Sequence, residues 1–227
     1  MKILSWNLER PKKNQAMKIE KIKSLIVAEN PDIIILTENN LCLDFGEKYF
    51  SLHTTVLPPI YENQNYSEGE NRVSIYSKFP FKEKISTYDS FTSICGLVET
   101  PFGELTIYGS IIGSFGGRGF HFENDLEQQK NDITNLKGNI CFSGDFNISF
   151  SGWKYPGAKV IEETKDFFEN QNLEILTKKN EDSAIHTVIN MDFLSNKTYT
   201  TKMIEIEKNI SDHNLIICEI FNQNQHK

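Results

Sequence analysis

Short runs of apolar, largely β-branched residues recur along the chain and predict strands. Several of these runs are apolar throughout, so we expect the strands to be covered on both faces. The runs are separated by glycine, proline and polar clusters that mark turns. The expected strands are 2–8, 33–36, 73–77, 95–99, 104–110, 140–143, 173–176, 184–188, 192–195, 203–207 and 215–221.

Three other segments carry apolar residues three or four positions apart and predict helices over 14–29, 122–136 and 160–168. The first helix should end at Asn30, because a residue before proline avoids the helical region. Residues 41–71 are polar and irregular, so we expect mostly loop there. Strands outnumber helices, and two packed sheets with helices on their outer faces would cover the apolar strands.

Composition narrows the class of protein. The chain has 227 residues and a formal net charge of −7, and we expect one domain over residues 1–227 in a monomer. It has no apolar run long enough to span a membrane and no secretory leader, and the four cysteines have no CxxC spacing. These features predict a cytoplasmic protein with buried, reduced thiols. The acidic balance argues against a generally basic surface, but it does not exclude one basic groove.

Polar side chains interrupt the apolar runs at their ends. If the strands that end in these residues run antiparallel to the strands that begin after them, all of these side chains reach one rim of the sandwich. Several carboxylates at one rim repel each other, and a hard divalent cation such as Mg²⁺ relieves this repulsion. The rim lacks the several His and Cys ligands of a zinc site, and a single His beside carboxylates and Asn suits cleavage of a phosphate ester. The residues are Asn7, Glu38, Asp145 and Asn147 after strands, and Asp192, Asp212 and His213 before strands.

These polar residues lie in motifs with a known order. The sequence resembles the endonuclease/exonuclease/phosphatase superfamily, which has the deoxyribonuclease-I-like fold. The resemblance covers nearly the whole chain and implies an α/β fold, a four-layer α/β/β/α sandwich of two mostly antiparallel sheets with helices outside. The motifs are Ser5-Trp6-Asn7, Pro31-Asp32-Ile33-Ile34-Ile35-Leu36-Thr37-Glu38, Val73-Ser74-Ile75-Tyr76-Ser77-Lys78-Phe79-Pro80, Gly144-Asp145-Phe146-Asn147, Met191-Asp192-Phe193 and Ser211-Asp212-His213.

The resemblance implies a role for each matched residue. Glu38 would bind the metal, and Asn7 and Asp212 would help to order the metal site. Asp145 would orient or deprotonate the attacking water, and Asn147 would hold the scissile phosphate. His213 would contact the phosphate and stabilise charge in the transition state. Asp192 would hold His213 in place.

Tyr108 is a further candidate, with two interpretations left open. Family members that repair abasic DNA have a phosphate-contacting tyrosine near this position, followed by a Pro-x-Asn-like stretch. The chain instead continues Gly109-Ser110-Ile111-Ile112, which weakens that assignment. Tyr108 is therefore either a site residue or a structural tyrosine, and Ser110 on the same face is its rival.

Substrate choice should depend on loops around the rim. The candidate loops are 61–72, 113–121 with Arg118, and 149–159 with Trp153, Lys154 and Tyr155. The two aromatic residues beside the lysine suit base stacking and phosphate contact, or they anchor the loop.

The favoured hypothesis is a Mg²⁺-dependent phosphodiesterase in which Mn²⁺ substitutes, acting as a nuclease on DNA by in-line attack of water. One alternative is a phosphatase or phosphodiesterase for a small-molecule, nucleotide or lipid phosphate ester. A second alternative is a non-catalytic binding module on the same fold. No protein partner is implied.

Overall fold

The strands of the computed structural model form two six-stranded sheets and a two-stranded hairpin, within residues 1–115 and 119–223, which the structure describes. The first sheet has the order β13 (Lys197–Ile204), β14 (Leu215–Asn222), β1 (Lys2–Asn7), β2 (Ile33–Asn40), β6 (Glu70–Ser77) and β3 (Phe50–His53). The second has the order β11 (Leu173–Ile175), β12 (Ile185–Asn190), β10 (Ile140–Asp145), β9 (Gly103–Ile111), β8 (Ser93–Thr100) and β7 (Phe81–Ile85). The hairpin pairs β4 (Ile60–Tyr61) with β5 (Gln64–Asn65).

The sheets are mostly antiparallel, as the sequence predicts. Two parallel pairs interrupt this pattern, β1 with β2 and β9 with β10. Each parallel pair is joined by a crossover that contains a helix, which is the connection that parallel strands require. The crossovers bring the carboxyl ends of β1, β2, β9 and β10 to one end of the molecule.

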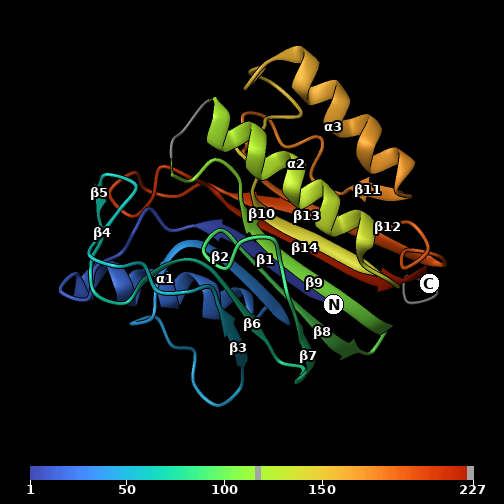
Figure 1. Cartoon of the computed structure of the whole chain (residues 1–227). Coiled ribbons are helices and arrows are strands. Elements are labelled where there is room, and N and C mark those ends of the chain that lie inside the picture. The colour runs from blue at the N-terminus through green and yellow to red at the C-terminus, as the bar shows by residue number, and fades with distance from the viewer. Residues whose placement is uncertain (116–118, 224–227) are drawn as a thin grey trace.

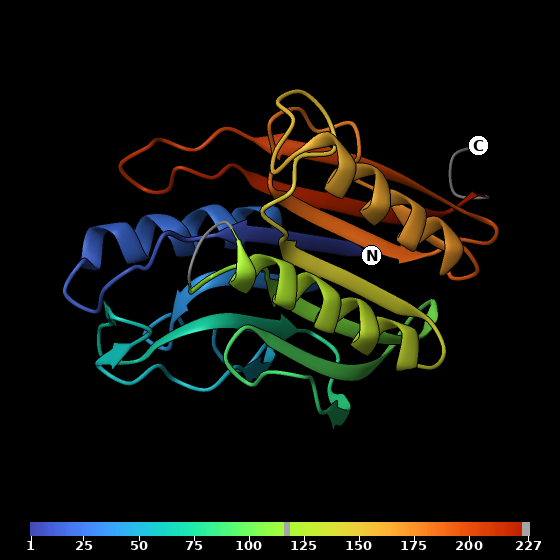
Figure 2. The same cartoon turned by 45° about the horizontal axis from the view of Figure 1, so that its top comes forward.

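Three helices in the described residues complete four layers: α1 (Ala16–Glu29), α2 (Phe120–Asn135) and α3 (Ala158–Asn170). The two sheets lie face to face, with α2 and α3 side by side over the second sheet and α1 beside the first (Figure 1). Figure 2 shows the same layers with α2 and α3 turned toward the viewer. The expected α/β/β/α sandwich is confirmed.

Three apolar clusters fill the spaces between these layers. The cluster between the sheets includes Ile35, Ile75 and Ile107, which come from both sheets. A second cluster, which includes Phe142, joins the second sheet to α2 and α3, and a third, which includes Ile22, joins the first sheet to α1. Strands between two apolar layers bury both faces, which explains why the runs at 33–36 and 140–142 are apolar throughout.

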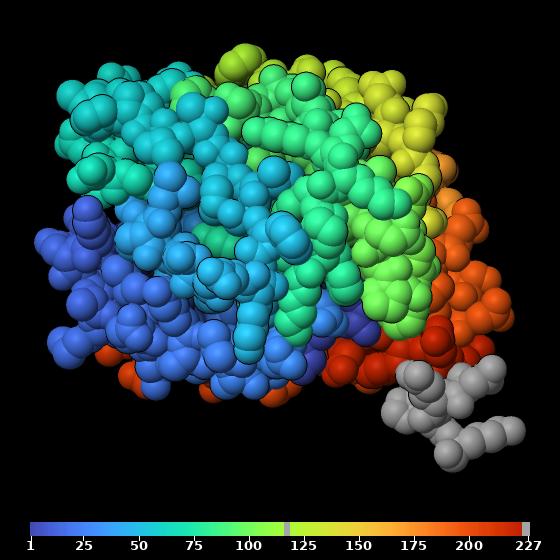
Figure 3. Space-filling view, turned by 90° about the horizontal axis from the view of Figure 1, so that it is seen from below, coloured from blue at the N-terminus to red at the C-terminus, as the bar shows by residue number. Residues whose placement is uncertain are grey.

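The structure corrects three expectations about local elements. The strand expected at 203–207 is β13, which spans Lys197–Ile204 and leaves 205–207 outside any strand. Residues 192–195 form a turn after β12 and not a strand. The segment 41–71, expected to be loop, contains β3, β4, β5 and the first residues of β6. In the space-filling view, the chain between α1 and β6, coloured blue to cyan, lies beside β7 and β8, coloured green (Figure 3). This segment therefore covers one side of the sandwich.

The four cysteines are free thiols, and Cys95, Cys141 and Cys218 are buried. Their burial raises the pKa of Cys95 and Cys218 to about 12, so these thiols are protonated at neutral pH. In the part of the chain that the structure describes, no helix is both long enough and apolar enough to cross a membrane.

Candidate active site

One hydrogen bond links the two sheets at the end where β1 and β10 terminate. Asn7, the last residue of β1, donates from Nδ2 to Oδ2 of Asp145, the last residue of β10, over 2.7 Å. The two residues are 138 positions apart, and both are almost fully buried. Two separate apolar strands thus place their terminal polar side chains against each other.

The second carboxylate oxygen of Asp145 is held by its own loop. The backbone N–H of Asn147 donates to Oδ1 over 3.0 Å, and Asn147 has a positive φ of 50°. The Asn147 side chain donates in turn to the carbonyl of Ile112 over 2.8 Å. The Gly144-Asp145-Phe146-Asn147 motif is therefore a tight turn that fixes the position of the Asp145 carboxylate.

His213 lies beside the same carboxylate. Its Nε2 is 4.0 Å from Asp145 Oδ2 and 3.4 Å from Asp212 Oδ1. The Ser211 hydroxyl accepts from the His213 backbone N–H over 3.0 Å and donates to the Asn7 carbonyl over 2.7 Å. The Trp6 indole donates to the His213 carbonyl over 3.0 Å. The Ser211-Asp212-His213 motif is thus attached to the end of β1.

Glu38 occupies a break in the β2 ladder. Thr37 pairs with Val73 and Asn39 pairs with Asn71, but Glu38 has no such partner and its φ is +48°. Its carbonyl accepts from the Arg10 backbone N–H over 3.0 Å. The irregular backbone turns the side chain out of the regular alternation of the strand.

The Glu38 carboxylate is available to a cation. Its side chain is 23% exposed, and its Oε1 is 3.7 Å from Arg72 Nη1, which is too long for a hydrogen bond. Burial raises the pKa of Glu38 and the nearby Asp145 raises it further, whereas Arg72, His213 and Arg10 lower it. A carboxylate that is partly desolvated and faces a second carboxylate is a favourable ligand for a hard cation.

The donor set fits one cation better than a dense cluster of acids. Among the described residues, no group of three or more His, Cys, Asp and Glu side chains has the spacing of a metal site. Both oxygens of Asp145 already accept hydrogen bonds, so the Glu38 carboxylate is the more open oxygen donor. A Mg²⁺ ion uses one or two carboxylates, with water and substrate oxygens as its other ligands, and these residues meet that need.

Two buried arginine–glutamate contacts beside Glu38 are absent from the sequence analysis. Arg72 and Glu70 are each 1% exposed, and Arg72 Nη1 lies 3.9 Å from Glu70 Oε1. Arg72 donates to the Tyr66 hydroxyl over 3.1 Å, and Glu70 also pairs with Arg10. The sequence does show two opposite charges, Glu70 and Arg72, just before the apolar run 73–77. Charged residues at such a position are equally typical of a loop, so they do not predict a buried ion pair.

The structure does not bring Asp192 to this site, which corrects the sequence expectation. In the register of β10 with β12, Asp145 pairs with Ile185 at the start of β12. Asp192 lies beyond the far end of β12, in an exposed turn at the opposite end of the sheet. A residue there cannot hold His213, which is held by Ser211 and Asp212 instead.

Tyr108 and its rival Ser110 also lie outside the site. Tyr108 is fully buried, and its hydroxyl donates to Oδ2 of Asp132 in α2 over 2.7 Å. The Ser110 hydroxyl donates to Gln129 in the same helix. Both side chains therefore attach α2 to the outer face of the second sheet, which favours the structural interpretation of Tyr108.

The predicted substrate loops are only partly described. Arg118 lies outside the described residues. Trp153 is 65% exposed and stacks on Tyr155 at 5.4 Å between ring centroids, and Lys154 is exposed beside them. This loop follows β10 and so starts from the active-site end of the sheet.

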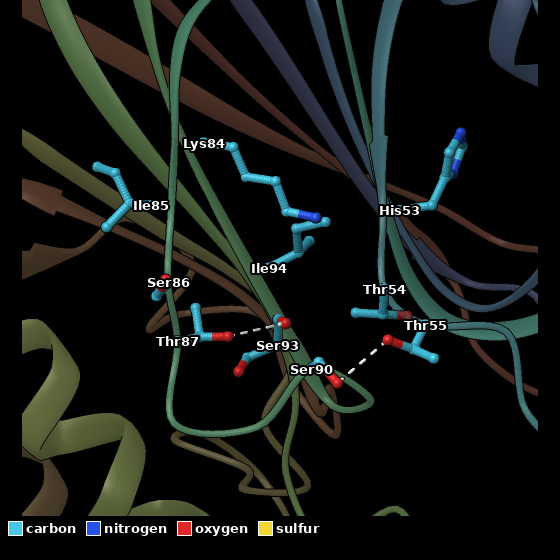
Figure 4. A pocket seen from close by; sticks show the side chains of 10 residues that line it. All are labelled: His53, Thr54, Thr55, Lys84, Ile85, Ser86, Thr87, Ser90, Ser93 and Ile94. Carbon is cyan, nitrogen blue, oxygen red and sulfur yellow. Dashed lines mark hydrogen bonds between the residues drawn. The ribbon is translucent and has the colours of Figure 1, made fainter.

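A separate hollow of about 240 Å³ lies at the edge of the sandwich between β3 and β7. Its walls carry several hydroxyl groups, and the Lys84 side chain points into it (Figure 4). Hydrogen bonds from Thr87 to the Ser93 carbonyl and between Thr55 and Ser90 connect its walls. None of the predicted site residues lines it, so it is distinct from the candidate active site.

Comparisons with known proteins identify the family and the fold. A family model described as "Endonuclease/Exonuclease/phosphatase family" matches residues 4–163. No curated protein matches the sequence. An endonuclease/exonuclease/phosphatase structure from Beutenbergia cavernae has a TM-score of 0.71 at 12% identity, over 98% of this chain and 71% of that chain.

Two other solved structures show the same fold. D. rerio TDP2 complexed with single-strand DNA product has a TM-score of 0.69 at 14% identity, over 98% of this chain and 99% of that chain. A beta toxin mutant from Staphylococcus aureus with bound magnesium ions has a TM-score of 0.63 at 18% identity, over 96% of this chain and 98% of that chain. At these identities the likeness shows the fold alone.

Proposed function

The chain belongs to the endonuclease/exonuclease/phosphatase family, and from this membership we propose that it is a divalent-metal-dependent phosphodiesterase that acts on DNA as a monomeric nuclease. The observation that carries the proposal is the bond between Asn7 and Asp145 across the two sheets, with His213 beside it. A buried carboxylate oriented by two hydrogen bonds and flanked by an imidazole suits acid–base chemistry on a phosphate ester.

Glu38 would hold the metal, and Asn7 and Asp212 would help to order its surroundings. When bound, a Mg²⁺ or Mn²⁺ ion would polarise the phosphate and stabilise the charge that develops on its oxygens. The residues of this chain supply oxygen donors, which these hard cations prefer to sulfur and imidazole.

Asp145 would orient the attacking water and accept its proton. Its carboxylate is held by Asn7 on one oxygen and by the Asn147 backbone on the other, so the remaining lone pairs have a fixed direction. Such preorganisation lowers the cost of reaching the transition state. The Asn147 side chain would contact the scissile phosphate after it exchanges its bond to the Ile112 carbonyl.

His213 would donate a hydrogen bond to a phosphate oxygen as negative charge accumulates there. The carboxylates of Asp145 and Asp212 lie 4.0 Å and 3.4 Å from its Nε2 and flank the imidazole in this position. Ser211 fixes the backbone on which the imidazole is mounted.

The test compares wild-type protein with Asp145→Ala, His213→Ala and Glu38→Gln on plasmid and linear DNA with Mg²⁺ or Mn²⁺. We expect cleavage by wild type and losses of at least about 100-fold in each variant, as single acid–base groups contribute 10²–10⁴. Calorimetric Mn²⁺ titration should show binding to wild type and weaker binding to Glu38→Gln. Absence of cleavage, or cleavage that survives in Asp145→Ala, would refute the proposal.

The alternative is a phosphodiesterase for a small phosphate ester, and the net charge of −7 is the observation that favours it. A panel of small esters distinguishes the two functions. Turnover of a small ester by a protein that leaves DNA intact would support the alternative, and the same three variants should abolish that turnover.

A further inference from the structure

We infer that a cleft beside Glu38 binds a second phosphate group of a polynucleotide strand, next to the phosphate that is cleaved. This inference rests on the proposed function and narrows its substrate class. The cleft has a volume of about 580 Å³, within the range of ligand sites. We call it the basic cleft, and its described lining residues are Glu9, Arg10, Lys12, Gln15, Lys18, Asn65, Tyr66, Ser67, Lys208 and Asn209.

The basic cleft is directly continuous with the candidate active site. Glu9 and Arg10 follow Asn7 by two and three residues, and the Arg10 backbone N–H donates to the Glu38 carbonyl over 3.0 Å. The Glu9 backbone N–H donates to the Asn7 side-chain oxygen over 2.9 Å. When the scissile phosphate of a polynucleotide lies at Glu38, the adjacent part of the polynucleotide therefore lies next to the basic cleft.

One wall of the cleft is already rigid. The Arg10 guanidinium pairs with buried Glu70, bonds to the Asn65 carbonyl and lies 4.7 Å from the Tyr66 ring centroid. The Tyr66 ring carries a second cation, Arg72, at 4.9 Å. Because Glu70 and Tyr66 hold the Arg10 side chain, little side-chain entropy is lost when it meets an anion.

The other cations of the cleft, Lys12, Lys18 and Lys208, form no ion pair within the described residues. Within the described chain, the ammonium groups of Lys12 and Lys208 form no ion pair, and Lys18 Nζ reaches only the Glu9 carbonyl, at 3.3 Å. Glu9 is the single acidic residue among the described residues of the lining. Burial lowers the pKa of Lys18, while the nearby carboxylates of Glu9, Asp212 and Glu38 raise it.

Three lysines that form no ion pair within the described chain line a cleft with one carboxylate, Glu9, in a protein whose net charge is −7. Such a local positive potential raises the local concentration of anions and steers them to the site. A small ester with one phosphate would be bound at Glu38 and His213 and would leave these cations unused. A polynucleotide strand carries further phosphates beside the scissile one. Its phosphates would therefore occupy both the candidate active site and the basic cleft.

The test replaces the three lysines with Lys12→Gln, Lys18→Gln and Lys208→Gln together. The matched control replaces three exposed lysines at the opposite end of the molecule, with Lys48→Gln, Lys82→Gln and Lys137→Gln. Both variants lose the same net charge. Melting temperature and circular dichroism of each variant establish that it is folded.

Fluorescence anisotropy with a labelled single-stranded 12-mer in EDTA measures binding without cleavage. We expect the dissociation constant of the cleft variant to rise about tenfold at low salt, and the slope of its logarithm against log salt to shrink by about 1. The control variant should show less than a twofold change. Equal behaviour of the two variants, or no binding of the 12-mer by wild type, would overturn the inference.

Turnover separates this inference from the proposed function. With Mn²⁺, the cleft variant should show a larger rise in KM for the 12-mer than for a dinucleoside monophosphate, which has one phosphate. If wild type cleaves neither DNA nor small esters, the proposed function fails. If wild type cleaves DNA and both variants have the same KM for the 12-mer, only the second phosphate site fails.

Discussion

Gly144 is the position where a single methyl group should damage the site most. Its φ is +146°, and it pairs with Ser110 in the parallel ladder of β10 and β9. A Cβ at this position would overlap the Ser110 carbonyl oxygen and lie 2.9 Å and 3.0 Å from the Ser110 carbonyl carbon and nitrogen. These are backbone atoms of a central strand, so they cannot move aside as a flexible side chain does.

The expected cost of Gly144→Ala has two parts. A residue with Cβ in this backbone region costs about 1–3 kcal/mol in strain. Separating β9 from β10 weakens one or two ladder hydrogen bonds, at about 1 kcal/mol each. The sum is about 2–5 kcal/mol, which for a chain of this length lowers the melting temperature by on the order of 10 °C.

Gly138→Ala is the matched control. Gly138 also has a positive φ, +76°, but a Cβ there would meet no atom within 4 Å. It should therefore show the strain alone, about 1–2 kcal/mol and a few degrees. The difference between the two variants isolates the overlap with Ser110.

Urea unfolding at 25 °C measures both free energies, and DNA cleavage below the melting transition measures the effect on Asp145. We expect Gly144→Ala to lose at least about tenfold in kcat/KM, because Asp145 follows directly and a misplacement near 1 Å carries large penalties. The reasoning is refuted if the two variants differ by less than about 1 kcal/mol in unfolding free energy, since the overlap would then have no measurable cost.

Three other predictions follow from buried groups. Burial lowers the pKa of His186 from 6.5 to about 4, so the unfolded chain binds a proton that the fold does not. As the pH falls from 6.5 to 4, this group should therefore remove up to about 3 kcal/mol from the free energy of unfolding. Urea unfolding checks this, because the free energy of unfolding should depend more steeply on pH in wild type than in His186→Gln. Burial raises the pKa of Glu38, which destabilises the fold where this carboxylate is ionised; in EDTA at pH 7, Glu38→Gln should melt a few degrees higher, and the gain should vanish as the pH falls below the ordinary value of 4.5. A lower melting temperature at pH 7 would contradict this. Tyr108→Phe removes a buried hydrogen bond to Asp132 and should lower stability by about 1–2 kcal/mol with kcat/KM within twofold, whereas a tenfold loss of cleavage would return Tyr108 to the site.

The sequence predicted those parts of the site in which a buried strand ends in a polar residue. The apolar runs before Asn7, Glu38 and Asp145 predict strands covered on both faces, and the structure buries each run completely. Because parallel and crossover-connected strands end at the same rim, the meeting of these three residues follows from local pattern and topology.

Asp192 shows where the pattern fails. The residues after it read as the start of an apolar strand, and Phe193 is indeed only 2% exposed. It reaches the core between the sheets from a turn, after β12 has already ended at Asn190. Burial of one aromatic side chain therefore does not distinguish a strand from a turn, and the end of the sheet on which an acid lies depends on that distinction.

The buried charges beside Glu38 show a second limit, which is physical. Arginine and glutamate side chains are almost never fully buried unless they are paired. Here the buried Glu70 pairs with Arg10, which is 60 positions away along the chain. No local pattern reports such a partner. The same contacts bear on how an acidic chain would receive the proposed anionic substrate. Arg72 and Arg10 offset the carboxylates of Glu38 and Glu70 inside the fold, and the lysines of the basic cleft form no ion pair within the described residues. The net charge of the molecule is thus a poor guide to its substrate, because the sign of the potential at the site is set by which charges are already paired.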